Sequence, residues 1–147
     1  AIAEGFLEQL NEWWEWMEMA GFGHRKSSGA GAFKRVGSVK PADGQLPTAS
    51  QPNAFATLSA YVPKADDPVK GHYRTRIKRG KLGEGYALKK PWKKPLIMLT
   101  PGSIFRTDGA DVADYYGQLV EEIHWTIEGI VQYAYAFPLP VRLVRKE

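Results

Sequence analysis

Residues 125–143 read WTIEGIVQYAYAFPLPVRL, and their side chains alternate between two faces more regularly than those of any other segment. A period of two is the spacing of a β-strand, in which neighbouring side chains point to opposite sides of a sheet. Pro138 and Pro140 lack the amide hydrogen that a central strand donates, so we expect an edge or a bend there. The residues of one face are Trp125, Ile127, Gly129, Val131, Tyr133, Tyr135 and Phe137, continued by Leu139, Val141 and Leu143.

Other segments also have strand patterns. Alternation predicts strands at residues 54–62 and 72–80, and the apolar run PLIMLT at 95–100 is short enough for a buried strand. A turn at Gly102 and Ser103 precedes a further short strand at 104–106, and residues 32–36 also fit a strand. Residues 111–124 stay open between two interpretations. Gly117 interrupts their helical stripe and weakens the helix interpretation; the stripe comprises Val112, Tyr115, Tyr116, Leu119 and Ile123.

One amphipathic helix is expected near the beginning of the chain, over residues 2–17, ending at Gly21. Its polar side is acidic. Three tryptophans, Trp13, Trp14 and Trp16, cannot all face one core, and Trp16 is expected to contact a neighbouring segment or a partner. With one or two helices and about six strands, the predicted class is α+β with a largely antiparallel sheet.

Composition narrows the class of protein. The 147 residues are 44% apolar and 12% aromatic, which supports a packed core rather than a disordered chain. The chain has no cysteine, which excludes disulfides and thiolate metal sites and is compatible with a reducing compartment. No apolar run approaches the roughly 20 residues of a membrane span. Because the helix pattern begins at once, we expect a processed chain or a fragment of a longer one.

Basic residues are concentrated in one segment. Residues 64–94 hold eleven Lys and Arg against three Asp and Glu, which indicates either a face for a polyanion or a solvated lysine-rich loop. Arg74, Arg76 and Lys78 would lie roughly 7 Å apart on one side of a strand, close to the spacing of phosphates. The alternative is an edge strand that charge protects from aggregation. Tyr86 and Trp92 would stack bases or simply anchor the loop.

The loop GFGHRKSSGAGAF, residues 21–33, combines four glycines with hydrogen-bond donors. It lacks the order of a mononucleotide P-loop, and it follows a helix where a dinucleotide fingerprint follows a strand. The loop would therefore wrap a phosphodiester backbone, with Arg25, Lys26, Ser27 and Ser28, or pack against a sheet. His24 is a candidate general acid or base for metal-free RNA cleavage, although a phosphate-facing or solvent histidine is the simpler interpretation. The scattered histidines predict no metal site, and no cofactor is expected.

The motif G-x-G-x-x-x-S-S-G-x-G-x-F of this loop resembles the glycine-rich loop of the RAMP superfamily of CRISPR-associated proteins. Three further segments are similar to the fourth Csm subunit of type III CRISPR effector complexes: KKPLIMLTPGSIF (93–105), YYGQLV (115–120) and IVQYAYAFPLPV (130–141). Together they are spread over residues 21–141. The resemblance also implies a strand at residues 117–124, which the glycine at 117 favours over a helix. This chain departs from the family at His24 and Ala134, where glycine is common, and at Ala32, where a cation is common. The missing cation weakens the case for phosphate contact after the loop.

The resemblance implies ferredoxin-like (RRM-like) domains: the end of a first domain at 1–38, a linker at 39–52 and a second domain at 53–147. It also implies a cytoplasmic, non-catalytic RNA-binding subunit in antiviral defence. Such a subunit holds the single-stranded 5′ handle of the CRISPR RNA and docks the large Cas10-type subunit beside the backbone RAMP subunits of a hetero-oligomeric ribonucleoprotein. The combined RNA-binding candidates are Gly21, Gly23, His24, Arg25, Lys26, Ser27, Ser28, Gly29 and Gly31 in the loop, and Arg74, Arg76, Lys78, Tyr86 and Trp92 in the basic segment.

Two other functions are compatible with the sequence. One is a metal-independent RAMP endoribonuclease that processes CRISPR RNA with His24 as general acid or base. The other is a purely protein-binding piece that docks a partner through its acidic, tryptophan-bearing helix. The RNA-binding hypothesis differs from the last in predicting a steep salt dependence.

Overall fold

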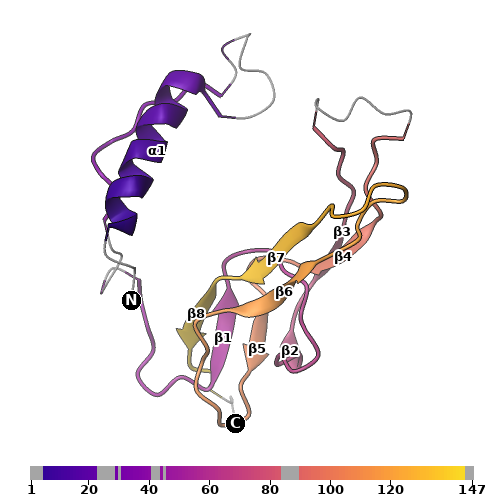
Figure 1. Cartoon of the computed structure of the whole chain (residues 1–147). Coiled ribbons are helices and arrows are strands. Elements are labelled where there is room, and N and C mark those ends of the chain that lie inside the picture. Colours follow the sequence, from indigo (N-terminus) through magenta and orange to yellow (C-terminus); the bar gives the residue numbers. More distant parts are fainter. Residues whose placement is uncertain are drawn as a thin grey trace. The chain divides into compact units, whose positions relative to one another are not determined.

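The computed structural model describes residues 5–22, 29, 31–40, 44, 46–83 and 90–144, which divide between two compact units, 1–45 and 46–147 (Figure 1). Within these residues there is one helix, and every strand pair is antiparallel. The predicted α+β class with an antiparallel sheet is therefore confirmed. The elements are α1 Phe6–Ala20, β1 Ala54–Thr57, β2 Gly71–His72, β3 Thr75–Lys78, β4 Leu96–Leu99, β5 Ile104–Arg106, β6 Tyr116–Val120, β7 Gln132–Ala136 and β8 Pro138–Val141.

Helix α1 ends where the sequence predicts. The amide of Gly21 donates to the carbonyl of Met17 over 2.8 Å, and Gly21 itself has a positive φ of 73° that glycine adopts without strain. None of the helix residues is buried. Trp14 packs edge-on against Phe33 at 5.9 Å between ring centroids, while Trp16 keeps 71% of its surface exposed. No described helix has both the length and the apolar character needed to cross a bilayer.

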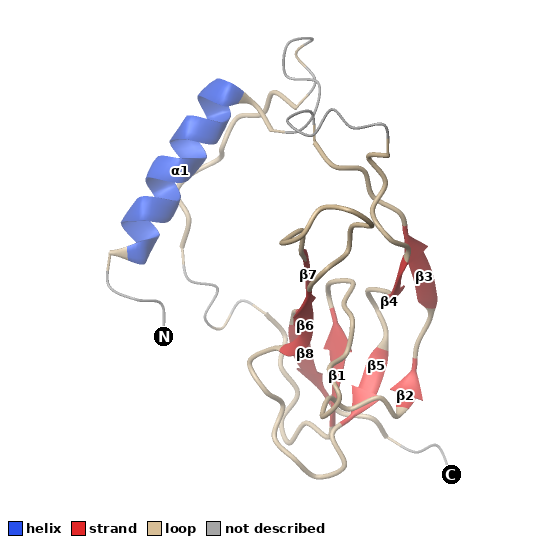
Figure 2. Cartoon of the chain, turned by 45° about the vertical axis from the view of Figure 1, so that its right-hand side comes forward, coloured by secondary structure: helices blue, strands red, loops and turns tan. Residues whose placement is uncertain are grey.

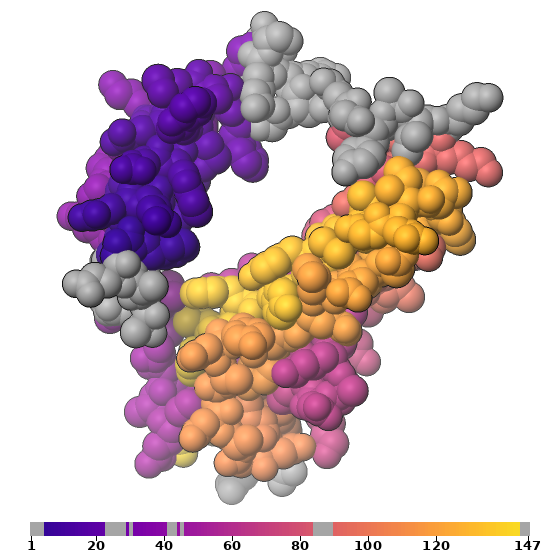
Figure 3. Space-filling model, in the orientation of Figure 1, coloured from indigo at the N-terminus to yellow at the C-terminus, as the bar shows by residue number. Residues whose placement is uncertain are grey.

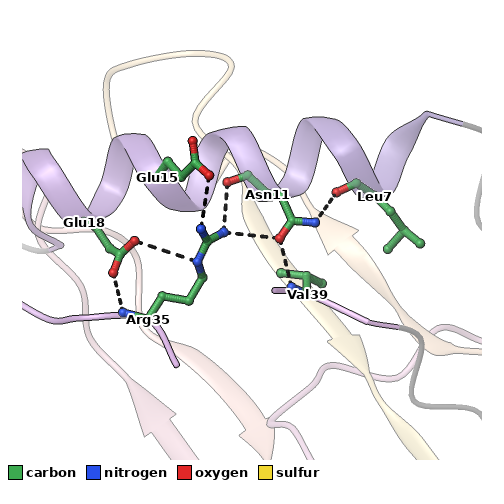
Figure 4. A network of polar contacts seen from close by, with 6 residues as sticks. All are labelled: Leu7, Asn11, Glu15, Glu18, Arg35 and Val39. Atoms are coloured by element: carbon green, nitrogen blue, oxygen red, sulfur yellow. Dashed lines mark hydrogen bonds and ion pairs between the residues drawn. The ribbon is translucent and has the colours of Figure 1, made fainter. Parts of the chain in front are cut away.

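The expected strand at 32–36 is wrong. Residues 31–40 instead form an irregular segment beside helix α1. Hydrogen bonds and ion pairs from side chains connect the segment to the helix (Figure 4). The backbone amide of Arg35 donates to the Glu18 carboxylate, and its guanidinium donates to the backbone and side-chain oxygens of Asn11 at 3.2 Å. Asn11 also accepts the amide of Val39 at 2.9 Å. Side chains of helix α1 accept the backbone amides of Arg35 and Val39 and take the place of a neighbouring strand.

A four-stranded sheet with the order β2-β5-β1-β8 forms the base of the second unit (Figure 2). Strand β8 lies at its edge, with Pro140 opposite Phe55 and Pro138 opposite Thr57. This confirms the edge predicted from the two prolines. The pattern at 54–62 is only partly a strand, because β1 ends at Thr57 and pairing resumes as an isolated bridge at Tyr61.

Two hairpins, β3–β4 and β6–β7, complete this unit. The pattern at residues 72–80 becomes two strands: β2 joins the four-stranded sheet and β3 pairs with β4. The main chain links the hairpins through Tyr61, which pairs with Leu99, and through Val62, whose amide donates to the carbonyl of Ala134 at 3.1 Å.

Strand β6 resolves the ambiguity at residues 111–124 in favour of a strand. Gly117 makes this possible, because its φ is +92° and a Cβ there would lie 2.4 Å from the carbonyl oxygen of Ala134. Its amide donates over 2.6 Å to the buried carboxylate of Asp67, which also accepts the amide of Lys64. The residue that disrupted the helical pattern is thus the one that lets β6 approach β7.

Aromatic rings fill the core. Phe55 stacks on Tyr116 with ring centroids 4.1 Å apart and also contacts Phe105, which Tyr61 meets edge-on at 5.9 Å. The hydroxyl of Tyr61 is buried without a hydrogen-bond partner among the described residues. Burial, followed by the nearby Asp67, strongly raises the pKa of Tyr61, so this hydroxyl stays neutral.

The long strand expected from Trp125 onward begins only at Gln132. The residues before it form a loop, closed by the amide of Ile123 donating to the carbonyl of Ile130 at 3.1 Å, with Gly129 at a φ of +72°. In β7 itself Ala134 is fully buried, whereas Tyr133 is 70% exposed. The orange and yellow surface of this part of the chain occupies much of the visible face of the unit (Figure 3).

Candidate nucleic-acid interface

The β3–β4 hairpin collects most of the basic segment. Its described parts, residues 71–83 and 90–99, contain eight Lys and Arg and no Asp or Glu. Beyond β3 the two arms of the hairpin stay paired. Lys81 forms a β-bridge with Trp92, and the amide of Lys93 donates to the carbonyl of Gly80 at 2.8 Å. The ion pairs among described residues involve Arg35 and Lys70, and none uses a cation of this hairpin. The described part of the hairpin therefore presents uncompensated positive charge.

The predicted row of Arg74, Arg76 and Lys78 is only partly open. Arg74 and Arg76 are exposed, but Lys78 is half-buried in a small hollow with Lys93 and Ile123. Arg74 lies beside a different hollow of about 380 Å³, between residues 72–74 and 100–103. The three cations thus do not form one continuous exposed row. Strand twist and the packing of the hairpin against 123–132 account for the difference.

Lys78 combines partial burial with like charges nearby. Burial, followed by the like charges of Lys93 and Arg76, lowers the pKa of Lys78 from its ordinary value of 10.5. When folding lowers the pKa of a lysine, the charged form of that lysine destabilises the folded state. The free energy of unfolding therefore rises with pH as the pH passes from the lowered value to 10.5. An anion bound beside these cations would relieve the same repulsion.

We expect Lys78→Met to raise the thermal stability of the protein and, at the same time, to weaken RNA binding. Removing the charge abolishes the repulsion with Lys93 and Arg76, while losing one phosphate contact lowers affinity by about 5-fold at 0.1 M salt. Thermal unfolding at neutral pH and fluorescence anisotropy with labelled RNA measure the two effects. A variant that is less stable and binds RNA equally well would contradict this role of Lys78.

Two tryptophans line one pocket beyond the end of strand β3. Trp92 and Trp125 line one open pocket of about 380 Å³ together with Arg79, Lys93 and Pro95. Trp92 is 53% exposed and Trp125 63% exposed. The ammonium of Lys81 lies 4.4 Å from the ring centre of Trp92, and that of Lys94 lies 5.7 Å from the ring centre of Trp125. Each indole is thus accompanied by a cation.

A buried histidine, His124, fixes the loop that carries Trp125. The ring of His124 is 3% exposed; its Nδ1 accepts the amides of Thr126 and Ile127 at 3.2 Å, and its Nε2 lies 3.0 Å from the carbonyl oxygen of Lys90. Because Nδ1 accepts, Nε2 carries the hydrogen and donates to Lys90. The amide of Lys94 also donates to the carbonyl of Ile123 at 2.7 Å. The loop that carries Trp125 is therefore fixed to the hairpin that carries Trp92.

The sequence predicts Trp92 as part of this site, but not Trp125 or His124. The strand pattern places Trp125 on one face of a long strand, whereas the turn signal Glu128-Gly129 is the evidence for a loop instead. His124 stands out in the sequence only as one of three scattered histidines. Tyr86 lies outside the described residues, so its predicted stacking role stays a prediction.

The glycine loop belongs to the other unit, and Gly23 and residues 24–28 lie outside the described residues. Gly21 ends helix α1, and Gly31 pairs with Phe22, whose amide donates to the Gly31 carbonyl at 2.9 Å. A Cβ on Gly31 would lie 1.8 Å from the carbonyl oxygen of Phe22, and φ is +87°. Gly29 also has a positive φ, of +76°, but open space around it. Close approach of the chain explains glycine at 31, and backbone conformation explains it at 29.

No protein-family model matches this chain, and no curated protein matches its sequence.

Proposed function

We propose that this protein is a non-catalytic RNA-binding scaffold subunit, and that RNA lies along the β3–β4 hairpin. The observation that carries the proposal is the meeting of cations and exposed indoles at the outer part of that hairpin. Single-stranded nucleic acid is bound by cations that follow the backbone and by aromatic rings that stack on bases. Arg79, Lys81 and Lys93 supply the first, and Trp92 and Trp125 supply the second.

The distribution of charge supports a polyanion on this hairpin rather than on strands β6 and β7. Residues 107–141, which include both of those strands, contain six Asp and Glu and no Lys or Arg. Tyr133, Tyr115 and Phe137 are also exposed aromatics in this part of the chain, but the cation–π contacts among the described residues involve other rings. Trp125 lies in the same acidic segment, but the ammonium of Lys94 lies 5.7 Å from its ring centre, and Arg79 and Lys93 line the pocket that it shares with Trp92. Of these two aromatic regions of the second unit, the one with cations fits RNA.

The resemblance to the fourth Csm subunit suggests which RNA the protein binds and in which complex. In this proposal the ligand is the single-stranded 5′ handle of a CRISPR RNA, in a cytoplasmic type III effector complex. The protein docks the large Cas10-type subunit and adjoins the backbone RAMP subunits. The ferredoxin-like identity of the domains and the contribution of the glycine loop, Gly21 to Phe33, belong to the same proposal.

Binding of the full chain to labelled single-stranded RNA of CRISPR-repeat sequence, with a chelator present, tests this function. We expect saturable binding, intact RNA after incubation and weaker binding to a duplex of the same sequence. About five phosphate contacts would give a slope of about −3.5 in log affinity against log salt concentration. A slope near zero would contradict the proposal. RNA cleavage that is abolished by His24→Ala would instead support the endoribonuclease.

A further inference from the structure

Trp92 and Trp125 leave large apolar surface in water, which is unfavourable for a folded chain unless something covers it. Their rings are not packed on other aromatic rings: among the described residues, the aromatic pairs involve other side chains, and both indoles contact lysines instead. A lysine ammonium over an indole occupies at most one of its two faces. Both tryptophans therefore keep surface available to a ligand in the pocket that they share.

We propose that this pocket receives one unpaired nucleobase, turned out of the RNA strand and stacked on an indole, while Arg79 and Lys93 contact the adjacent phosphate. The inference rests on the proposed RNA-binding function and adds the subsite and its ligand. Its volume of about 380 Å³ lies within the range of about 300–1,000 Å³ typical of small-molecule sites. The subsite is distinct from the hollow beside Arg74, which contains no tryptophan.

The chemistry of the lining favours a base over other flat or apolar groups. An apolar peptide side chain would gain nothing from four nearby cations, whereas a nucleotide carries a phosphate beside its base. Stacking on indole is open to every base, since each has a π-face. A free mononucleotide offers the same chemistry as a base within a strand, so the test must separate these two sources.

The pocket is also pre-organised for a ligand. His124 joins the Trp125 loop to the Lys90 carbonyl, and the amide of Lys94 joins the hairpin to the same loop at Ile123. Two connections between the loop and the hairpin reduce the freedom that binding would otherwise remove. His124 is thus a positioning residue for the subsite.

Binding of the full chain to a series of RNAs, each with one abasic ribose, tests the subsite. For intact RNA we expect Trp125→Ala to weaken binding by about 5- to 150-fold and Trp125→Phe to retain most of the affinity. One abasic position should weaken wild-type binding similarly, and Trp125→Ala should add no further loss there. Tyr133→Ala is the matched control, since it removes an exposed ring outside the pocket. Excess adenosine monophosphate should compete only if the pocket prefers free nucleotides.

The outcomes separate the subsite from the function on which it rests. If Trp125→Ala weakens binding no more than Tyr133→Ala, or equally for intact and all abasic RNAs, the subsite is refuted while salt-dependent RNA binding can stand. If adenosine monophosphate binds the wild-type protein as tightly as the RNA does, and Trp125→Ala abolishes that binding, a free nucleotide and not a base within a strand is the ligand. If wild-type protein does not bind RNA at all, the proposed function itself fails. An unchanged salt slope in Trp125→Ala would show that the variant keeps its phosphate contacts.

Discussion

Replacing Arg79, Lys81 and Lys93 together by alanine is expected to weaken RNA binding on the order of 100-fold at 0.1 M salt. Each phosphate contact with single-stranded RNA contributes a slope of about −0.7 in log affinity against log salt, so three lost contacts lower the slope by about 2. Arg79 and Lys93 line the tryptophan pocket, and Lys81 lies over Trp92. Fluorescence anisotropy over a salt series measures affinity and slope together.

The matched control removes three positive charges outside the β3–β4 hairpin. Lys64, Lys70 and Arg142 are cations of the same unit that lie outside the hairpin, and their triple alanine variant also lowers the net charge by three. We expect this control to change affinity by only a few-fold, through the general field of the protein. Equal losses in the two triple variants would show that net charge, and not the position of the cations, determines RNA binding.

Gly117→Ala is expected to destabilise the second unit by about 2–6 kcal/mol. A residue with a Cβ is strained by roughly 1–3 kcal/mol at an unfavourable positive φ, and an overpacked core costs about as much again. At Gly117 φ is +92°, and the added Cβ would lie 2.4 Å from the Ala134 carbonyl oxygen and 3.1 Å from the Tyr61 ring. The clash would also disturb the hydrogen bond to Asp67. Urea unfolding of the full chain measures the loss.

Gly109 provides the control for this substitution. Its φ is +93°, nearly equal to that of Gly117, but a Cβ there has no neighbour within 4 Å. Gly109→Ala should therefore cost only the strain of the backbone, about 1–3 kcal/mol. If both substitutions cost the same, close packing of β6 on β7 is not the reason for glycine at 117.

The sequence predicts local structure better than it predicts contacts between residues that are far apart in the chain. The presence of helix α1, its end at Gly21 and the edge strand with Pro138 and Pro140 depend on neighbouring residues, and these predictions are confirmed. The predicted start at residue 2 is wrong, because Gly5 has a left-handed conformation and the helix begins at Phe6. Residues 32–36 have a strand pattern, but the acceptors on helix α1 that bind Arg35 are 17 to 24 residues away. Periodicity cannot reveal such partners, because a strand and an extended segment on a helix have the same local pattern.

In the candidate site, too, local features are predictable from the sequence and long-range contacts are not. The density of Lys and Arg between residues 64 and 94 is evident in the sequence, and Trp92 within it is a natural candidate. Trp125 reaches the pocket only because the loop at 123–130 folds back on the hairpin and His124 bonds to Lys90. Nothing in the local sequence joins positions 92 and 125. Only the tertiary contacts bring them to one pocket.

Photo-crosslinking is the most direct test of where RNA lies on this protein. The full chain would be irradiated with single-stranded repeat RNA that contains 4-thiouridine, and the cross-linked peptides would be identified by mass spectrometry. We expect cross-links within residues 79–94 and at Trp125. Cross-links confined to the acidic region around Tyr133, with none in the β3–β4 hairpin, would contradict RNA binding at this site.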